Sequence, residues 1–154
     1  MGDTVRSTLS VHAHHDKERT VSAMTNEITT DPARIRELLL INLFAVFSER
    51  DPQRRLKVIE ESYTEDVIWS DPETTVHGHE AMNQRAQVVL DGVPGFVFTA
   101  AGPVHVLRDL GYLAFVHGVP EQPPAVTGFD VAMVRDGRIA VLYTVVTSGG
   151  PAAP

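Results

Sequence analysis

Apolar residues recur at helical spacing in the first half of the chain and in alternating runs in the second half. The first apolar stripe follows Asp31-Pro32, an acceptor and a proline of fixed φ that together are typical of a helix start. The stripe continues to Phe47 with little polar surface, which predicts a helix that is buried on most sides. Asn42 is the polar residue at its centre and is interpreted either as a hydrogen-bonded core amide or as a pocket residue.

Two more helices and one short strand are expected before the middle of the chain. A second Asp-Pro pair predicts a helix over 52–62, and a glycine precedes a third helix over 80–90. In the segment between these helices, alternation places Val67, Trp69 and Asp71 on one face of a short strand.

The second half is rich in β-branched and aromatic residues, which favours strands. Four runs are separated by glycine and proline turns, and they cover residues 96–107, 111–119, 125–134 and 138–147. The pattern lacks the β-α-β alternation of a parallel sheet. It predicts an α+β fold, in which three helices pack over one side of a strongly curved antiparallel sheet and enclose a pocket.

Composition narrows the class of protein. The 154 residues carry 13 basic and 20 acidic side chains, a net charge of −7 that disfavours binding to nucleic acid, and no cysteine for disulfides or metal–thiolate sites. No apolar run is long enough to span a membrane and no secretory signal is visible, so we expect a cytoplasmic protein. Residues 1–29 are interpreted as a loosely packed leader, 30–148 as one domain and 149–154 as a flexible tail.

Three ionisable residues lie where a sheet would favour apolar ones, and they are the candidate catalytic groups. Asp71 ends its strand, His117 interrupts the run over 111–119, and Asp130 interrupts the run over 125–134. A hairpin closed near Pro123 would place His117 and Asp130 opposite each other as an acid/base pair. Each residue also has a non-catalytic interpretation. Asp71 could open a turn, His117 could be a hydrogen-bonded core residue, and Asp130 could be a carboxylate on a solvated face.

The side chains expected to bind a substrate are those that share a predicted pocket face with these groups: Trp69, Phe115, Asn42, Val67 and Ala132. His77 and His79 stand close to Asp71 along the chain, but no helical ligand spacing accompanies them, and His12, His14 and His15 lie in the leader. We therefore expect neither a metal nor a cofactor.

At this point the sequence resembles a known family. The segments that carry the resemblance are Tyr63-Thr-Glu-Asp-Val-Ile-Trp-Ser-Asp-Pro72, Val76-His-Gly-His-Glu-Ala81, Ala101-Gly-Pro-Val104 and Phe129-Asp-Val-Ala-Met-Val-Arg-Asp-Gly-Arg-Ile139. They are similar to segments of the nuclear transport factor 2-like superfamily, above all its SnoaL-like polyketide cyclases and ketosteroid isomerases.

The resemblance implies a cone-shaped α+β barrel with a deep apolar pocket, often dimeric through its sheet. Asp71 matches the carboxylate that shuttles a proton in ketosteroid isomerases, and Asp130 matches the protonated acid of their oxyanion hole. His117 and Asp130 match the pair credited with aldol chemistry in the cyclases. The two tyrosines of the isomerases are replaced here by Leu43 and Ala86, which favours cyclase-like chemistry.

The resulting hypothesis is a cofactor-independent acid/base enzyme that acts on a small apolar carbonyl metabolite, by aldol cyclisation or by isomerisation next to the carbonyl. Asp130 with His117 is the preferred working pair, and Asp71 is the alternative base. Two alternatives remain open: a non-catalytic ligand-binding or dimerisation module, and a dehydratase or epoxide hydrolase. The expected partners are the metabolite and a second copy of the chain, with no nucleic acid or membrane.

Overall fold

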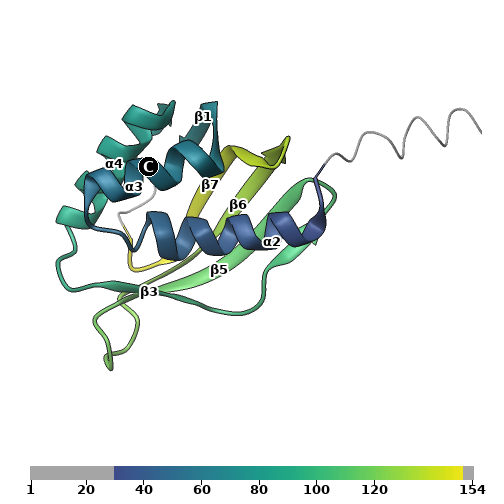
Figure 1. Cartoon of the computed structure of the whole chain (residues 1–154). Helices are drawn as coiled ribbons and strands as arrows, with labels where there is room; N and C mark the ends of the chain where they lie inside the picture. The colour runs from purple at the N-terminus through teal and green to yellow at the C-terminus, as the bar shows by residue number, and fades with distance from the viewer. Residues whose placement is uncertain (1–29, 151–154) are drawn as a thin grey trace, which may run out of the picture.

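The computed structural model describes residues 30–150, so the predicted leader and the last residues of the predicted tail lie outside it. The helical segments are α2 (Pro32–Ile41), η1 (Asn42–Val46), α3 (Pro52–Ser62) and α4 (His79–Asp91). They lie on one side of a curved sheet (Figure 1). Within 30–150, no helix is long and apolar enough to cross a membrane.

The two predicted helix starts are confirmed, and the first helix differs from the prediction further along. Asp31 accepts a hydrogen bond from the backbone N–H of Ala33, and Asp51 accepts two from the first turn of α3. After Ile41 the α-helix widens into a π-helical turn that begins at Asn42. The expectation of burial on most sides is wrong, because Leu40 is 42% exposed and Phe44 49% exposed.

The sheet is open rather than a closed barrel. Its strand order is β2-β1-β7-β6-β5-β3, and β4 pairs with β5 at the same edge as β3. All pairs are antiparallel except β1 with β7. The predicted strand over 96–107 is two strands, because Gly102 (φ 132°) and Pro103 interrupt it. The strands are β1 (Tyr63–Ser70), β2 (Thr75–His77), β3 (Val97–Ala100), β4 (His105–Leu107), β5 (Leu110–Gly118), β6 (Val126–Arg135) and β7 (Arg138–Ser148).

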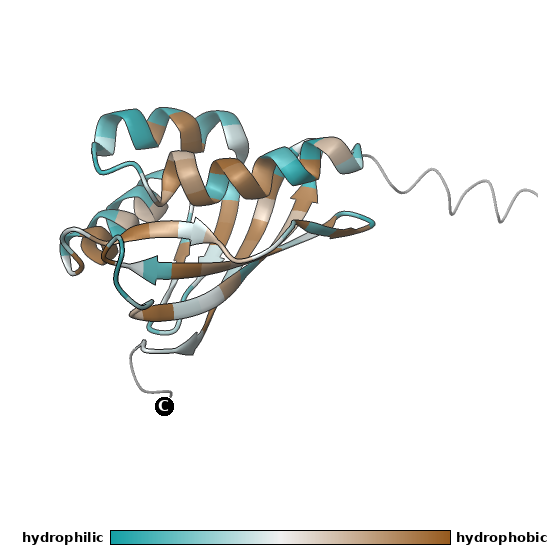
Figure 2. Cartoon of the chain, turned by 90° about the horizontal axis from the view of Figure 1, so that it is seen from below, coloured by the Kyte–Doolittle hydropathy of each residue, from teal (hydrophilic) through white to brown (hydrophobic). Residues whose placement is uncertain are grey.

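The core lies between the helices and the concave face of the sheet. The buried residues of α2 are Ile35, Leu38 and Leu39, and Figure 2 shows apolar stretches both in the helices and in the strands that they cover. Gly111 in β5 permits this close approach: a Cβ there would lie 2.8 Å from Cγ2 of Ile35 and closer still to Leu39. The helix therefore packs directly on the strand backbone, and Val67 and Ala132 are fully buried in the same core.

The β5–β6 hairpin has a different register from the one predicted. Its turn is centred near Glu121, which adopts a left-handed φ of 65°, rather than near Pro123. Leu113 is consequently the partner of Asp130, and Val126 is the partner of His117. His117 and Asp130 are thus not opposite each other, but the offset of four residues is even and keeps both on the concave face.

A buried arginine joins α3, α4 and the loop before α3. The fully buried Arg55 donates from Nε to Oδ1 of Asn83 (2.7 Å), from Nη1 to the carbonyl of Glu49 (2.7 Å) and from Nη2 to Oε1 of Gln87 (2.7 Å). A buried cation is tolerated when its donors are satisfied in this way. This network fixes α4, which forms one wall of a cavity.

Replacement of Arg55 by alanine should lower the free energy of unfolding by about 3 kcal/mol or more, because buried acceptors on Asn83 and partly buried acceptors on Glu49 and Gln87 lose their donor. Arg54 is the matched control, since its side chain is 74% exposed and pairs only with Glu49 and Asp51 at the surface. Arg54→Ala should cost less than about 1 kcal/mol. Urea denaturation measures both variants, and equal losses would contradict a special role for Arg55.

Candidate active site

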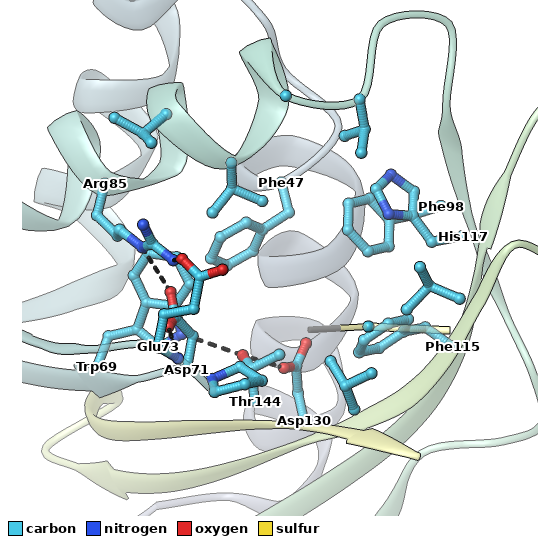
Figure 3. Close-up of a pocket in the computed structure, with 18 residues that line it drawn as sticks. Phe47, Trp69, Asp71, Glu73, Arg85, Phe98, Phe115, His117, Asp130 and Thr144 are labelled. Atoms are coloured by element: carbon cyan, nitrogen blue, oxygen red, sulfur yellow. Dashed lines mark hydrogen bonds and ion pairs between the residues drawn. The ribbon is translucent and has the colours of Figure 1, made fainter. Parts of the chain in front are cut away.

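A cavity of about 300 Å³ opens between the helices and the concave face of the sheet. Figure 3 shows its lining. Most of the wall is apolar, and its larger side chains are Phe47, Trp69, Val89, Phe98, Phe115 and Val146. The polar groups gather at separate places: Asp130 with Thr144, the cluster of Asp71, Glu73 and Arg85, and His117. A largely apolar cavity with a few fixed polar groups is typical of a small-molecule site.

Asp130 is a carboxyl group almost removed from water, with 4% of the residue exposed. Its Oδ1 accepts from the Thr144 hydroxyl (2.7 Å) and its Oδ2 from Nδ2 of Asn42 (2.8 Å). Burial raises the pKa of Asp130 to about 6, and the two hydrogen bonds oppose that shift. The group can therefore gain and lose a proton near neutral pH.

Two chains of donors converge on this carboxyl group. In one, Nε1 of Trp69 donates to the Thr144 hydroxyl (3.0 Å), which donates to Asp130. Because an indole N–H can only donate, the direction of this chain is fixed. In the other, the Tyr63 hydroxyl donates to Oδ1 of Asn42, whose Nδ2 donates to Asp130. Both chains hold the carboxyl group in place as an acceptor.

Asp71 has a different environment. Its Oδ2 pairs with Nε of Arg85 (2.6 Å), and its Oδ1 accepts the backbone N–H groups of Glu73 (2.8 Å) and Thr74 (2.9 Å). Arg85 also donates from Nη2 to Glu73 (2.8 Å), and together these bonds join α4 to the β1–β2 turn. Asp71 therefore opens the turn and also lies on the cavity wall.

His117 lies on another part of the wall, on β5. Its ring stacks flat on Phe98, with a centroid distance of 3.7 Å and an interplanar angle of 6°, and meets the edge of Phe96. Burial, assisted by the charge of Arg50, lowers the pKa of His117 to about 4. The imidazole is thus neutral at pH 7 and does not serve there as a charged acid.

Five of the eight predicted site residues line the cavity, namely Asp130, His117, Asp71, Trp69 and Phe115. The other three do not. Asn42 lies behind Asp130 and holds it, while Val67 and Ala132 pack in the core below the cavity. Their side chains share the concave face of the sheet, as predicted, but the helices cover them.

Sequence reasoning missed Thr144, Arg85 and Tyr63. Thr144 shares its strand face with Leu142 and Val146, so it is a polar residue in an apolar stripe, as His117 and Asp130 are. A search for polar residues at apolar strand positions would therefore have identified it. Arg85 and Tyr63 carry no comparable signal, because their roles depend on which helix and strand meet. Within residues 30–150, no three histidine, aspartate or glutamate side chains are grouped to hold a metal ion.

The raised pKa of Asp130 has a measurable effect on stability. The folded state holds the proton up to a pH of about 6, whereas an ordinary aspartate loses it near 3.8, so stability falls as pH rises between these values. Relative to Asp130→Asn, the wild type should lose on the order of 3 kcal/mol of unfolding free energy over that range and nothing more above pH 7. Urea denaturation at several pH values measures this, and a constant difference would contradict the shift.

Known structures share this fold. A protein assigned as an isomerase of the SnoaL-like family from Agrobacterium tumefaciens superposes with a TM-score of 0.70 at 19% identity, covering 75% of this chain and 99% of that one. A protein assigned as a SnoaL-like polyketide cyclase from Jannaschia sp. CCS1 superposes with a TM-score of 0.62 at 15% identity, covering 77% of this chain and 90% of that one. An LEH-like epoxide hydrolase from M. tuberculosis superposes with a TM-score of 0.55 at 11% identity, covering 74% of this chain and 83% of that one.

At these identities the similarity establishes the fold and leaves the reaction open. No curated protein matches the sequence. The model of the SnoaL-like domain matches residues 40–142, which include Asn42, Trp69, His117 and Asp130 and cover most of the described chain. The chain therefore belongs to the SnoaL-like domain family.

Proposed function

We propose that the protein is an acid/base enzyme that acts on a small apolar carbonyl compound, with Asp130 as the base. The observation that carries the proposal is one carboxyl group, with a pKa of about 6, at the wall of an apolar cavity. A general base is most effective when its pKa lies near the working pH. Asp130 would remove a proton from the carbon next to the carbonyl group.

The surroundings of Asp130 suit this role. Its partners Asn42 and Thr144 are neutral donors, so they hold the carboxylate without the strong stabilisation that a cation would give. Asp71, the alternative base, has its charge balanced by the Arg85 guanidinium, and its Oδ1 accepts two backbone N–H groups. These contacts favour Asp130 as the base and Asp71 as the residue that positions Arg85.

A second group must stabilise the negative charge that develops on the carbonyl oxygen. Arg85 lines the same cavity, and Asp71 and Glu73 fix its Nε and Nη2. Its remaining nitrogen, Nη1, is the donor that we assign to this oxygen. A donor held in advance at the place where charge develops lowers the barrier most effectively. Ring closure or migration of a double bond would then follow from the enolate.

The proposal predicts that the protein accelerates exchange of hydrogen for deuterium next to the carbonyl group. A panel of apolar cyclic ketones in D₂O, with 4-phenylcyclohexanone among them, tests this by NMR. Asp130→Asn should slow the exchange by about 10²-fold or more, because the base is lost. Asp71→Asn is the matched carboxylate control; it keeps an oxygen that can accept from Arg85 and thereby hold its position, so it should cost less than about tenfold. Unchanged exchange in Asp130→Asn would remove Asp130 from the mechanism.

The pH dependence of this exchange provides a separate test. Only the carboxylate form of Asp130 accepts a proton, so the rate should rise with pH through about 6 and then level off. A rate that is already constant between pH 4.5 and 8 would contradict the assignment of the base. Thr144→Val removes one donor to the carboxylate and should move the midpoint to higher pH, whereas Thr144→Ser should restore it.

A further inference from the structure

The His117 imidazole is a buried polar group without a hydrogen-bond partner. The residue is 5% exposed, it lines the cavity, and its Nε2 is buried with no partner among residues 30–150. Buried polar atoms are nearly always paired, so an unpaired one calls for a physical reason. The ring lines the cavity, so a ligand that reaches its polar edge can supply a hydrogen-bond partner to this histidine.

The ring is held in a fixed orientation. Phe98 stacks on one face and Phe96 meets the ring edge-on. Figure 3 shows the ring above Phe98 with its nitrogen-bearing edge turned away from the strand backbone. A ligand would therefore meet a ring whose orientation is already fixed, which lowers the entropic cost of binding. Because Nε2 is closed off from solvent, Nδ1 is the nitrogen that a ligand can reach without rearrangement of the wall.

The electrostatics of this part of the wall select for an uncharged partner. The imidazole is neutral, so it offers one donor and one acceptor and no charge. The nearby cation, Arg50, already donates to the carbonyl groups of Leu90, Val93 and Phe96. Elsewhere on the wall three carboxyl groups face one arginine, which opposes binding of an anion.

The register of the hairpin sets the separation between this group and the proposed base. His117 lies four residues from Leu113, the strand partner of Asp130, which corresponds to roughly 13 Å along the strand. The wall between them is aromatic and includes Phe115 and Phe98. Phe115 lies over Gly128, where a Cβ would approach its ring to within 2.8 Å, so the glycine keeps this ring against the sheet.

We propose that His117 recognises an uncharged hydroxyl or keto oxygen at the end of the substrate remote from the carbon that Asp130 deprotonates. The substrate class is then an elongated, uncharged ketone with an apolar body and a second oxygen at its far end. This inference rests on the proposed function for the position of the reacting carbon, and it assigns His117 to recognition rather than to proton transfer.

Two simple ketones that differ in one oxygen atom test the proposal: 4-phenylcyclohexanone and 4-(4-hydroxyphenyl)cyclohexanone. Trp69 is the single tryptophan of the chain and lines the cavity, so its fluorescence reports binding, and calorimetry provides the dissociation constants. At pH 7.5 the hydroxylated ketone should bind about five- to tenfold more tightly, as expected for one added hydrogen bond. The carboxylate 4-(4-oxocyclohexyl)benzoate should bind more weakly than either.

His117→Phe keeps a ring stacked on Phe98 and removes both nitrogens, so it should abolish the preference while it retains binding of 4-phenylcyclohexanone. His117→Gln restores a hydrogen-bonding group and should recover part of the preference, and it replaces His117→Phe as the test if that variant does not fold. No preference in the wild type, a preference that survives in His117→Phe, tighter binding of the carboxylate, or no binding of any of the three compounds overturns the proposal.

The same titrations separate this inference from the proposed function. Asp130→Asn should keep the preference for the hydroxylated ketone, because that preference arises at His117. If deuterium exchange fails to depend on Asp130 while the preference remains and depends on His117, the proposed base is wrong and the recognition site stands. If exchange depends on Asp130 and the preference is absent, the base stands and the recognition site is wrong.

Discussion

The site depends on a carboxyl group that the fold removes from water and must therefore supply with hydrogen-bond donors. Asp130 on β6 receives them from Asn42 at the start of the π-helical turn and from Thr144 on β7. These donors are in turn held by Tyr63 and Trp69, both on β1. Three strands and the first helix must be correctly placed before the carboxyl group is satisfied, so the chemistry of the site and the packing of the fold are linked.

Two aspartates of the same cavity show how partners decide what a carboxyl group can do. Asp71 is paired with a guanidinium group and with backbone N–H groups, an arrangement that stabilises its charge and fixes the β1–β2 turn. Asp130 has neutral partners, and burial raises its pKa to about 6. The contacts of Asp71 fix the β1–β2 turn at the cavity wall, whereas those of Asp130 leave a carboxyl group that can exchange a proton near neutral pH.

Much of the fold could be predicted from local signals. The Asp-Pro pairs set two helix starts, and strand alternation put Trp69, His117 and Asp130 on the concave face. The hairpin register could not be predicted, because it depends on where the proline-rich segment 119–125 turns, and Glu121 rather than Pro123 lies at the centre of the turn, in a left-handed conformation. The π-helical turn and the Arg85 contacts were also not predicted, because tertiary packing rather than local sequence determines them.

The fold alone leaves open whether the proposed base, Asp130, would act on a carbon acid or on water, because structures assigned as isomerase, cyclase and epoxide hydrolase all superpose on this chain. The hydrogen bonds of the site support our proposal of a carbon acid. A bound water is held by two to four polar partners, and the groups around Asp130 are already engaged: Trp69 with Thr144, Thr144 with Asp130, and Asn42 buried out of the cavity. The wall beside these groups is apolar. A carbon next to a carbonyl group fits such a wall, since the carbon itself contacts only the carboxylate oxygen that takes its proton, and Arg85 is the donor proposed for the carbonyl oxygen.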